Sequence, residues 1–357
     1  MTTAIVSDLH IGTSLGADVA RRPEVRERLG AALVDAEHVV FLGDLIELRE
    51  RPVASVVAQA RTVLGDLAGP LAGKRVTIVA GNHDHRLVEP CLDRLRVDGA
   101  ELALDWSGEA QGSPLAAELA RMLPGSDVAL AYPGLRIRAD VYALHGHYLD
   151  LHMVVPRLEC ILGRAMARRM LGPDPHFRTS ADYERAVGPL YSLSYSLAQG
   201  GGGGTASRFS NLSRDVWARA HSDGAIGAFL VGRVAIPTGV AALNLAGLGP
   251  YSADLTSDGL RQAGLRGIAD VLRNLGVEAE HVVFGHTHRH GPLPHEEDEP
   301  GWRTPDGTRL WNTGSWFLES ALVGERRQKS AYWPGGVIYV RDSGPPDPVN
   351  VLRDVEL

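Results

Sequence analysis

The feature that most constrains the fold is a junction that recurs along the chain, where a short apolar segment ends abruptly in a polar cluster. Helical patterns separate the first three junctions, and this alternation predicts a largely parallel, helix-covered sheet. In such sheets the functional side chains gather at the carboxyl ends of the strands. The five polar clusters are Asp8-Leu-His10, Gly43-Asp44, Gly81-Asn82-His83-Asp84, His145-Gly-His147 and Gly285-His286-Thr-His288.

The hydrophobic pattern also predicts which segments form the sheet and which form helices. Short apolar or alternating runs indicate strands, and Pro23 marks the first turn of a helix because its missing N–H costs nothing there. We expect helices at 23–36 and 52–68, and strands at 3–7, 38–42, 75–80, 135–144, 281–284, 309–313, 336–341 and 349–355.

Between the fourth and fifth junctions the pattern changes to longer helical stretches. We therefore expect one catalytic fold, built from residues 1–147 and 281–357, that is interrupted by a mostly helical insertion at 148–280. This insertion would form a cap that shapes access to the site. Within it, helices are expected at 151–171, 182–197 and 212–220, and a linker or mobile loop at 200–204.

One apolar stretch of the insertion, residues 224–250, approaches membrane-spanning length but contains Arg233. A central arginine costs about 2.5–3.5 kcal/mol on insertion into a bilayer, and the apolar run without it is too short for a span. We expect a buried or surface-packed helix pair and no transmembrane span. Peripheral contact with a lipid surface stays open.

Composition limits the classes of function. The chain has 357 residues and a formal net charge of −7, from 36 basic and 43 acidic side chains, so a general nucleic-acid binder is not favoured. Its two cysteines, Cys91 and Cys160, form neither a disulfide framework nor a Cys-x-x-Cys pair, and the first residues show no secretory signal. We expect a cytoplasmic protein, of unknown oligomeric state. The informative excess is histidine, with 14 copies.

The residue types in the five clusters indicate a metal site. Aspartate, histidine and an asparagine amide form a mixed oxygen and nitrogen ligand set, which suits Mn²⁺, Fe or Zn²⁺ better than Ca²⁺. Residues two apart on an extended segment point the same way, so both members of Asp8/His10 can face one ion. A single cluster of this kind is weak evidence, since a lone strand-end aspartate is usually a turn former or a helix cap. Five in this order are not readily explained by chance.

At this point the sequence resembles the calcineurin-like metallophosphoesterase superfamily. That family carries Asp-x-His, Gly-Asp-x-x-(Asp/Glu), Gly-Asn-His-(Asp/Glu), a later His and Gly-His-x-His, and this chain has all five blocks, with Glu47 closing the second. The turn Asn312-Thr-Gly-Ser315 is also similar to the family's Asn-x-Gly-Ser. The resemblance covers residues 1–147 and about 281–341. It implies an α/β fold in which a β-sheet sandwich is flanked by helices.

The resemblance also implies roles for individual residues. Two divalent or transition-metal ions, with Mn²⁺ the first choice and Fe, Zn²⁺ or Mg²⁺ as alternatives, would activate a hydroxide for phosphoester hydrolysis. His83 would act as general acid or cationic stabiliser and Asp84 would orient it. Glu47 would support a ligand, and His147 is left open as a ligand or substrate contact. Asp8, His10 and His288 would hold one metal, Asn82, His145 and His286 the other, and Asp44 would bridge them.

The substrate is not fixed by these motifs. Gly43-Asp-Leu-Ile-Glu47 departs from the serine/threonine phosphatase branch, and His83 stands where the similar UDP-diacylglucosamine pyrophosphatase branch tends to carry arginine. We expect a small phosphomonoester or phosphodiester, with a nucleotide-linked or lipid-linked ester left open and nucleic acid disfavoured. The alternatives are an inactive binding scaffold of the same fold and a nuclease of the same superfamily.

Overall fold

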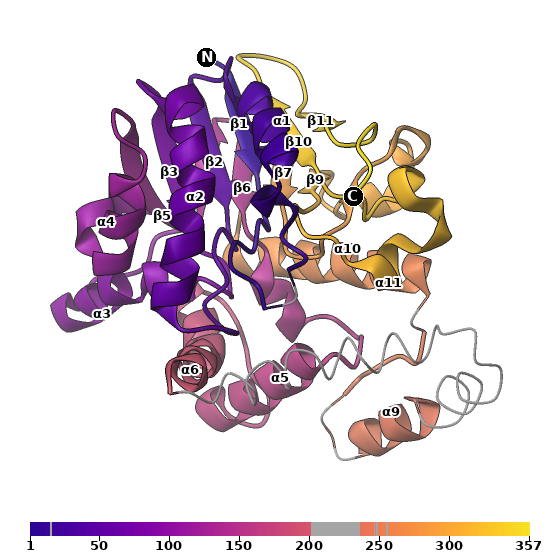
Figure 1. Cartoon of the computed structure of the whole chain (residues 1–357). Coiled ribbons are helices and arrows are strands. Elements are labelled where there is room, and N and C mark those ends of the chain that lie inside the picture. The colour runs from indigo at the N-terminus through magenta and orange to yellow at the C-terminus, as the bar shows by residue number, and fades with distance from the viewer. Residues whose placement is uncertain (15, 201–235, 246, 248, 255) are drawn as a thin grey trace.

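The computed structural model describes residues 1–14, 16–200, 236–245, 247, 249–254 and 256–357. Both termini lie away from the helical insertion, the N-terminus at the top in Figure 1. The helix expected at 212–220, the loop at 201–204 and the first part of the 224–250 stretch lie outside the described residues.

Eleven strands among the described residues form one hydrogen-bonded sheet, ten of them along a single path. Its order is β11-β10-β1-β2-β3-β5-β6-β7-β9-β8, with β4 paired to β5. The pairs β1–β2, β2–β3, β3–β5, β6–β7 and β7–β9 are parallel and the others antiparallel, so the sheet is mixed where we expected a largely parallel one. The strands are β1 (Thr3–Val6), β2 (His38–Leu42), β3 (Arg75–Val79), β4 (Asp105–Glu109), β5 (Asp127–Arg138), β6 (Val141–Leu144), β7 (His281–Phe284), β8 (His290–Gly291), β9 (Arg309–Thr313), β10 (Gly336–Val340) and β11 (Asp347–Asn350).

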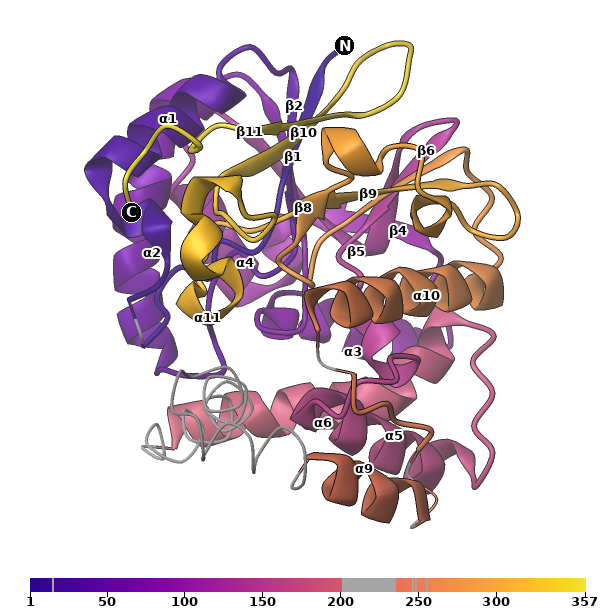
Figure 2. The ribbon, with the colours of Figure 1, turned by 90° about the vertical axis from the view of Figure 1, so that its right-hand side faces the viewer.

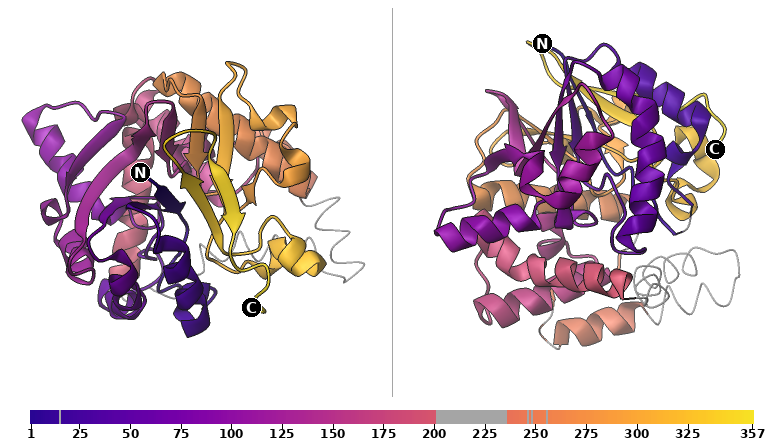
Figure 3. Two further views of the ribbon diagram at one scale, coloured as in Figure 1. Left: turned by 90° about the horizontal axis from the view of Figure 1, so that it is seen from above. Right: turned by 60° about the vertical axis from the view of Figure 1, so that its left-hand side comes forward.

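The long strand β5 divides the sheet into two layers that pack face to face. Its first part pairs with β3 and β4, and its last part pairs with β6. Apolar side chains from both layers, such as Ile5, Val40 and Val283, form one buried cluster between them, while Ala4 and Val6 belong to the larger core cluster. Figure 3 shows the two layers from above, with helices on the outside. The predicted sandwich flanked by helices is confirmed.

Helices cover the outer faces of the sandwich. Helices α1 (Pro23–Leu33) and α2 (Val53–Leu71) lie against the first layer in Figure 1, beside α3 (Glu89–Asp98) and α4 (Pro114–Arg121). On the second layer, α10 (Ser257–Leu275) runs between the strands and the insertion (Figure 2). Buried faces explain these positions, since Val56, Leu64 and Leu71 of α2 are fully buried.

The described residues of the expected insertion, 148–280, lie at the carboxyl ends of the strands, below the sheet in Figures 1 and 2. The short 3-10 helix η4 (His147–Leu151) spans its expected start, and α5 (Leu158–Leu171), α6 (Ser180–Gln199) and α9 (Ile236–Leu245) follow. The chain then returns to the core through α10. No helix among the described residues combines the length and hydropathy needed to cross a membrane.

Some predicted elements differ from the structure. The single strand expected at 135–144 is the end of β5 and the whole of β6, because the chain reverses at Ala139 and Asp140. The helix expected at 151–171 begins at Leu158. Strand β4 and helices α3 and α4 were not predicted, since β4 alternates only between exposed and half-buried residues and carries a weak apolar signal. The short helix α11 (Ser320–Val323) was not predicted either.

Candidate metal centre

Five of the seven candidate ligands have left-handed backbone conformations. Their φ angles lie between 45° and 66°. For residues other than glycine this conformation costs about 1–2 kcal/mol each, and such strain persists where the surrounding structure enforces it, commonly at functional sites. The strained backbone turns each side chain toward the centre directly after its strand. The residues are Asp8, His10, Asp44, His286 and His288.

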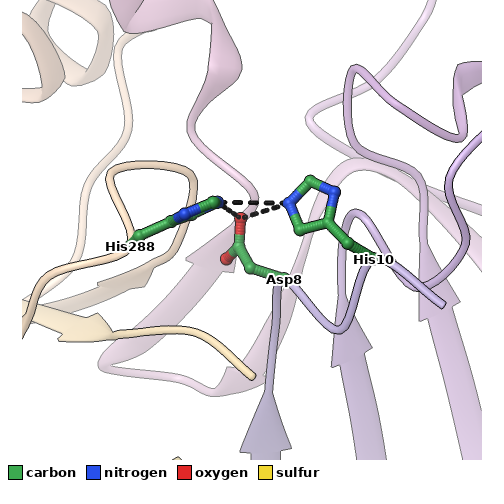
Figure 4. Close-up of side chains that lie close together, drawn as sticks. All are labelled: Asp8, His10 and His288. Atoms are coloured by element: carbon green, nitrogen blue, oxygen red, sulfur yellow. Dashed lines mark hydrogen bonds and ion pairs between the residues drawn. The ribbon is translucent and has the colours of Figure 1, made fainter. Parts of the chain in front are cut away.

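One group of three ligating atoms brings together β1 and the loop after β7. Nε2 of His10 lies 3.1 Å from Nε2 of His288, and Oδ1 of Asp8 lies 3.4 Å from the latter and 3.9 Å from the former. Figure 4 shows the three side chains pointing at one another. Among the described residues Asp8 Oδ1 is buried without a well-formed hydrogen bond. Three lone-pair donors that face a common point, two of them buried and His288 partly exposed, are what a cation would satisfy.

A second group lies beside the first and includes Asp44, Asn82, His145 and His286. Nε2 of His145 is 3.2 Å from Asp44 Oδ2 and 3.3 Å from the Asn82 amide. The same amide atom lies 3.3 Å from Asp44 Oδ2 and 3.1 Å from His286 Nδ1. An amide nitrogen at that position would donate to these acceptors, whereas an amide oxygen there would complete a ring of lone pairs around a cation.

Asp44 connects the two groups. Its Oδ2 lies 3.8 Å from Nε2 of His10 in the first group and 3.2 Å from Nε2 of His145 in the second. Its Oδ1 accepts a 2.8 Å hydrogen bond from the backbone N–H of His83, which fixes the carboxylate. The structure thus brings all seven predicted ligands together. Six of them form two metal-like groups, Asp8 with His10 and His288, and Asp44 with His145 and His286, and His83 belongs to a third group with His10 and Asp44. Their oxygen and nitrogen donors are of the kind that transition metals prefer.

In each histidine of the two groups, one ring nitrogen faces the other candidate ligands and the second ring nitrogen lies close to an oxygen atom. His10 Nδ1 lies 3.1 Å from Glu47 Oε2, and His145 Nδ1 lies 2.9 Å from the Leu42 carbonyl. Such contacts select the ring nitrogen that faces a metal and orient the ring. The remaining two pairs are His286 Nε2 with Asp150 Oδ2 at 3.1 Å and His288 Nδ1 with Glu319 Oε2 at 3.6 Å.

The electrostatics of the centre favour positive charge. Burial opposes a charge on His145, but the Asp44 and Asp8 carboxylates outweigh it and raise its pKa to about 10. Burial likewise opposes a charge on His288, and hydrogen bonds to Asp8 and Glu319 raise its pKa to about 9. The carboxylates therefore attract protons onto imidazoles in a dry site, and metal ions would replace those protons on binding.

His83 faces the same centre but contacts a different carboxylate from the one expected. Its Nδ1 lies 2.6 Å from Glu47 Oε2, its Nε2 lies 3.5 Å from Nη1 of Arg49, and the ring lines the cavity over the ligands. Burial lowers the pKa of His83, and Glu47 offsets this only in part. Burial by itself would raise the pKa of Glu47, but the neighbouring His83 and His10 lower it overall. Glu47 thus supports both His10 and His83.

The expectation that Asp84 orients His83 is wrong, because its carboxylate faces the backbone of the Asp44 loop. It accepts hydrogen bonds from the N–H groups of Leu45 and Gly81, both at 2.7 Å, and longer ones from Asp44 at 3.3 Å and Ile46 at 3.4 Å. Asp84 therefore fixes the loops that carry Asp44 and Asn82.

Glycines permit this close packing for two different reasons. Gly43 has a φ of 88°, as a sharp turn requires, whereas Gly81 needs space because a Cβ there would lie 2.3 Å from Asp44 Oδ1. The turn at 312–315 holds the other side of the site. Its Asn312 amide donates a 2.8 Å hydrogen bond to the Thr287 hydroxyl, between the two histidines of the last cluster.

His147 belongs to none of the metal-like clusters among the described residues. Its Nε2 lies 3.0 Å from the Tyr132 hydroxyl. That hydroxyl donates to Glu184 of α6 at 2.5 Å, and Glu184 also lies 2.9 Å from Nε2 of His85. A buried polar cluster, His85, Tyr132, His147, Tyr148 and Glu184, thus joins the insertion to two loops of the centre.

Four supporting residues were not found from the sequence. Asp150 and Glu184 lie in the insertion, Glu319 follows β9, and Arg49 follows the second motif. The only signal for Asp150 is a single acidic residue between apolar neighbours, five positions after His145. Glu319 likewise has no fixed spacing to a ligand. Their roles come from tertiary packing, which short motifs do not encode.

Comparison with known proteins relates the chain to a protein family. The sequence model of the calcineurin-like phosphoesterase family matches residues 1–178 of the chain. No protein with a curated description matches significantly. Among solved structures, a cold-active protein-tyrosine phosphatase from a psychrophilic Shewanella species aligns over 96% of this chain and 75% of its own, with 14% identity and a TM-score of 0.29. A dimetal phosphatase from Danio rerio aligns over 98% of this chain and 99% of its own, with 13% identity and a TM-score of 0.34.

Proposed function

The chain belongs to the calcineurin-like phosphoesterase family, and we propose that it is a metal-dependent hydrolase of a phosphomonoester or phosphodiester. The observation that carries the proposal is the pair of ligand groups joined at Asp44. Intact ligands in both groups favour an enzyme over an inactive scaffold of the same fold.

Each of the seven side chains has a proposed part in holding metal. Asp8, His10 and His288 would hold one ion, Asn82, His145 and His286 the other, and Asp44 would contact both. Bound there, two metal ions would supply Lewis-acid activation of water and charge neutralisation for a phosphoryl group. The oxygen and nitrogen donors support Mn²⁺ first, with Fe, Zn²⁺ and Mg²⁺ as alternatives.

His83 is the proposed proton donor to the leaving group. Its ring lines the cavity and is 18% exposed, while Glu47 orients it through Nδ1. Nε2 is then the atom that can reach a substrate oxygen. Arg49, which lies 3.5 Å from this atom, adds positive charge where negative charge develops on the substrate.

The division of the chain follows from the same site. We propose a catalytic domain of residues 1–147 and 281–357 and an insertion of 148–280 that shapes access. The cavity supports this division, because its wall combines ligands from the catalytic part with side chains from α5, α9 and α10. The cytoplasm is the proposed compartment, in which the buried free thiols of Cys91 and Cys160 stay reduced.

The direct test is hydrolysis of p-nitrophenyl phosphate and bis-p-nitrophenyl phosphate by the full chain supplied with Mn²⁺. Turnover that disappears with a chelator and returns with metal supports the proposal. Absence of metal-dependent turnover on both esters and on a wider panel, including single-stranded DNA for the nuclease alternative, would contradict it.

The role of His83 has a separate test. We expect His83→Asn to lower kcat for an alkyl phosphoester by about 100-fold and for a p-nitrophenyl ester much less, because p-nitrophenolate leaves without a proton. Equal losses on both esters would count against proton donation.

A further inference from the structure

The cavity above the ligand groups has two kinds of wall. Its volume is about 420 Å³, within the range of sites for small molecules. One wall is the candidate metal centre, including His10, Asp44 and His286. A second part of the lining comes from the insertion, α10 included. It contains an aliphatic wall of Val155, Ile161, Val240, Leu243, Leu260 and Leu265, beside the charged Asp150, Arg157, Glu159 and Arg261.

Most of the charged side chains that also line the cavity, Arg157 excepted, have an ion-pair partner among the described residues. Arg261 pairs with Glu299 and Asp258, and Arg289 pairs with Glu296. Asp150 faces His286, and Glu159 lies 3.8 Å from Arg49. Beside Arg157, these pairs leave the aliphatic side chains as an uncharged surface that a ligand next to the metal centre would meet.

We propose that the substrate is a phosphoester that carries an apolar chain, with the phosphate at the metal centre and the chain against the aliphatic wall of the insertion. The inference rests on the proposed function and names its substrate class. It follows from continuity, since one cavity contains both the ligands for a phosphate and the aliphatic surface. Removing apolar chain from water against this surface would supply binding energy.

The insertion provides a matched pair of residues on one helix. Leu243 and Leu245 both belong to α9, and Leu243 lines the cavity whereas Leu245 is 89% exposed. A polar substitution at Leu243 would therefore weaken binding of an apolar chain. The same substitution at Leu245 would test only the general effect of polarity on the helix.

The experiment compares two phosphonates that the enzyme cannot hydrolyse. Binding of methylphosphonate and decylphosphonate to the Mn²⁺-loaded full chain is measured by titration calorimetry, below the concentration at which decylphosphonate forms micelles. We expect decylphosphonate to bind at least about 100-fold more tightly, since each fully buried methylene contributes about fourfold. Equal affinities would overturn the inference.

The variants show where the chain binds. Leu243→Asn should weaken decylphosphonate about tenfold and leave methylphosphonate unchanged, whereas Leu245→Asn should change neither. Equal effects of the two variants would overturn the placement on the aliphatic wall. If Leu243→Asn does not fold, the comparison of the two phosphonates with the wild type still decides whether an apolar chain increases affinity.

Failure of the proposed function is distinguishable from failure of this inference. Turnover of p-nitrophenyl phosphoesters without any preference for decylphosphonate retains a phosphohydrolase and removes the apolar substrate. Preference for decylphosphonate without turnover of any ester retains a binding site for an apolar chain and removes the phosphohydrolase.

Discussion

The proposed catalytic part (residues 1–147 and 281–357) and the proposed insertion (148–280) contribute to the same centre in different ways. In the catalytic part, each ligand directly follows a strand or its turn, and five of the seven sit on strained backbone. The insertion contributes through Asp150 of η4, which contacts a ligand, and Glu184 of α6, which contacts residues beside the ligands. One region therefore supplies the candidate metal-binding atoms, and the other supplies support, anchoring and the aliphatic wall of the cavity.

The insertion therefore does more than cover the site, because its side chains also contact the core. It is tied to the core by the buried Glu184 carboxylate, whose partners are His85 and Tyr132 of the core and Tyr148 of the insertion itself. Burial by itself would raise the pKa of Glu184, but His85 and the two hydroxyl donors lower it overall. Substitutions in the two regions should therefore have different effects. Those in the core should lower the rate of hydrolysis, and those in the insertion should lower stability or metal affinity.

The largest effect is expected at the residue that joins the two ligand groups. Asp44→Asn should lower kcat/KM on p-nitrophenyl phosphoesters by about 1,000-fold. The reason is that a neutral amide cannot provide the negatively charged oxygens that the carboxylate offers to both ligand groups. Asp140→Asn is the control, since Asp140 lies in a separate cluster with Glu280 and His281 and should leave activity unchanged. Full activity in the Asp44 variant would remove the bridging role.

The anchor of the insertion should appear in stability. Glu184→Ala should lower the free energy of unfolding by about 3–5 kcal/mol, because it removes a buried charge from its partners. Arg185→Ala, next along α6, breaks only an exposed ion pair with Asp182 and should stay within about 0.5 kcal/mol of wild type. Urea denaturation measures both, and similar values for the two variants would contradict the anchoring role.

Asp150 should act on metal affinity. Asp150→Asn should weaken Mn²⁺ binding about tenfold, as expected when a group that orients a ligating histidine is lost. Asp174→Asn, at an exposed position of the insertion, should bind Mn²⁺ as wild type does. Titration calorimetry with Mn²⁺ gives the comparison, and an unchanged affinity in the Asp150 variant would limit the insertion to anchoring and access.

The smallest effect is a dependence of stability on pH in the insertion. Burial lowers the pKa of His152 to about 4, Asp270 opposes this, and Arg164 and Arg273 add to it. The unfolded chain then takes up a proton near pH 6.5, before the folded one, so stability is lost as pH falls from about 6.5 toward 4. We expect a loss of about 1 kcal/mol between pH 7 and pH 5.5 that is absent in His152→Gln. Identical pH profiles for the two proteins would contradict this.

The sequence predicted much of the catalytic part because its geometry is local. Strand β2 lies where expected, at His38–Leu42, and ligands two positions apart, such as His286 and His288, share a short turn. The hairpin between β5 and β6 was missed because Ala139 and Asp140 interrupt the alternation without a glycine or proline.

The supporting contacts could not be predicted for a different physical reason. Asp84 was assigned to His83 because the two are adjacent in sequence, yet the turn directs its carboxylate to the Asp44 loop. The carboxylate that contacts His83 instead belongs to Glu47, which is 36 positions away in the sequence. Glu184 and Asp150 depend on how the insertion packs on the core, and no spacing in the chain specifies that packing.

The central claim is that seven side chains hold two metal ions joined at Asp44. Electron paramagnetic resonance of the full chain with two equivalents of Mn²⁺ tests it most directly, because ions that share a carboxylate couple magnetically. We predict the spectrum of a coupled pair in the wild type and of uncoupled Mn²⁺ in Asp44→Asn. Binding of a single equivalent, or two uncoupled ions in the wild type, would contradict the claim.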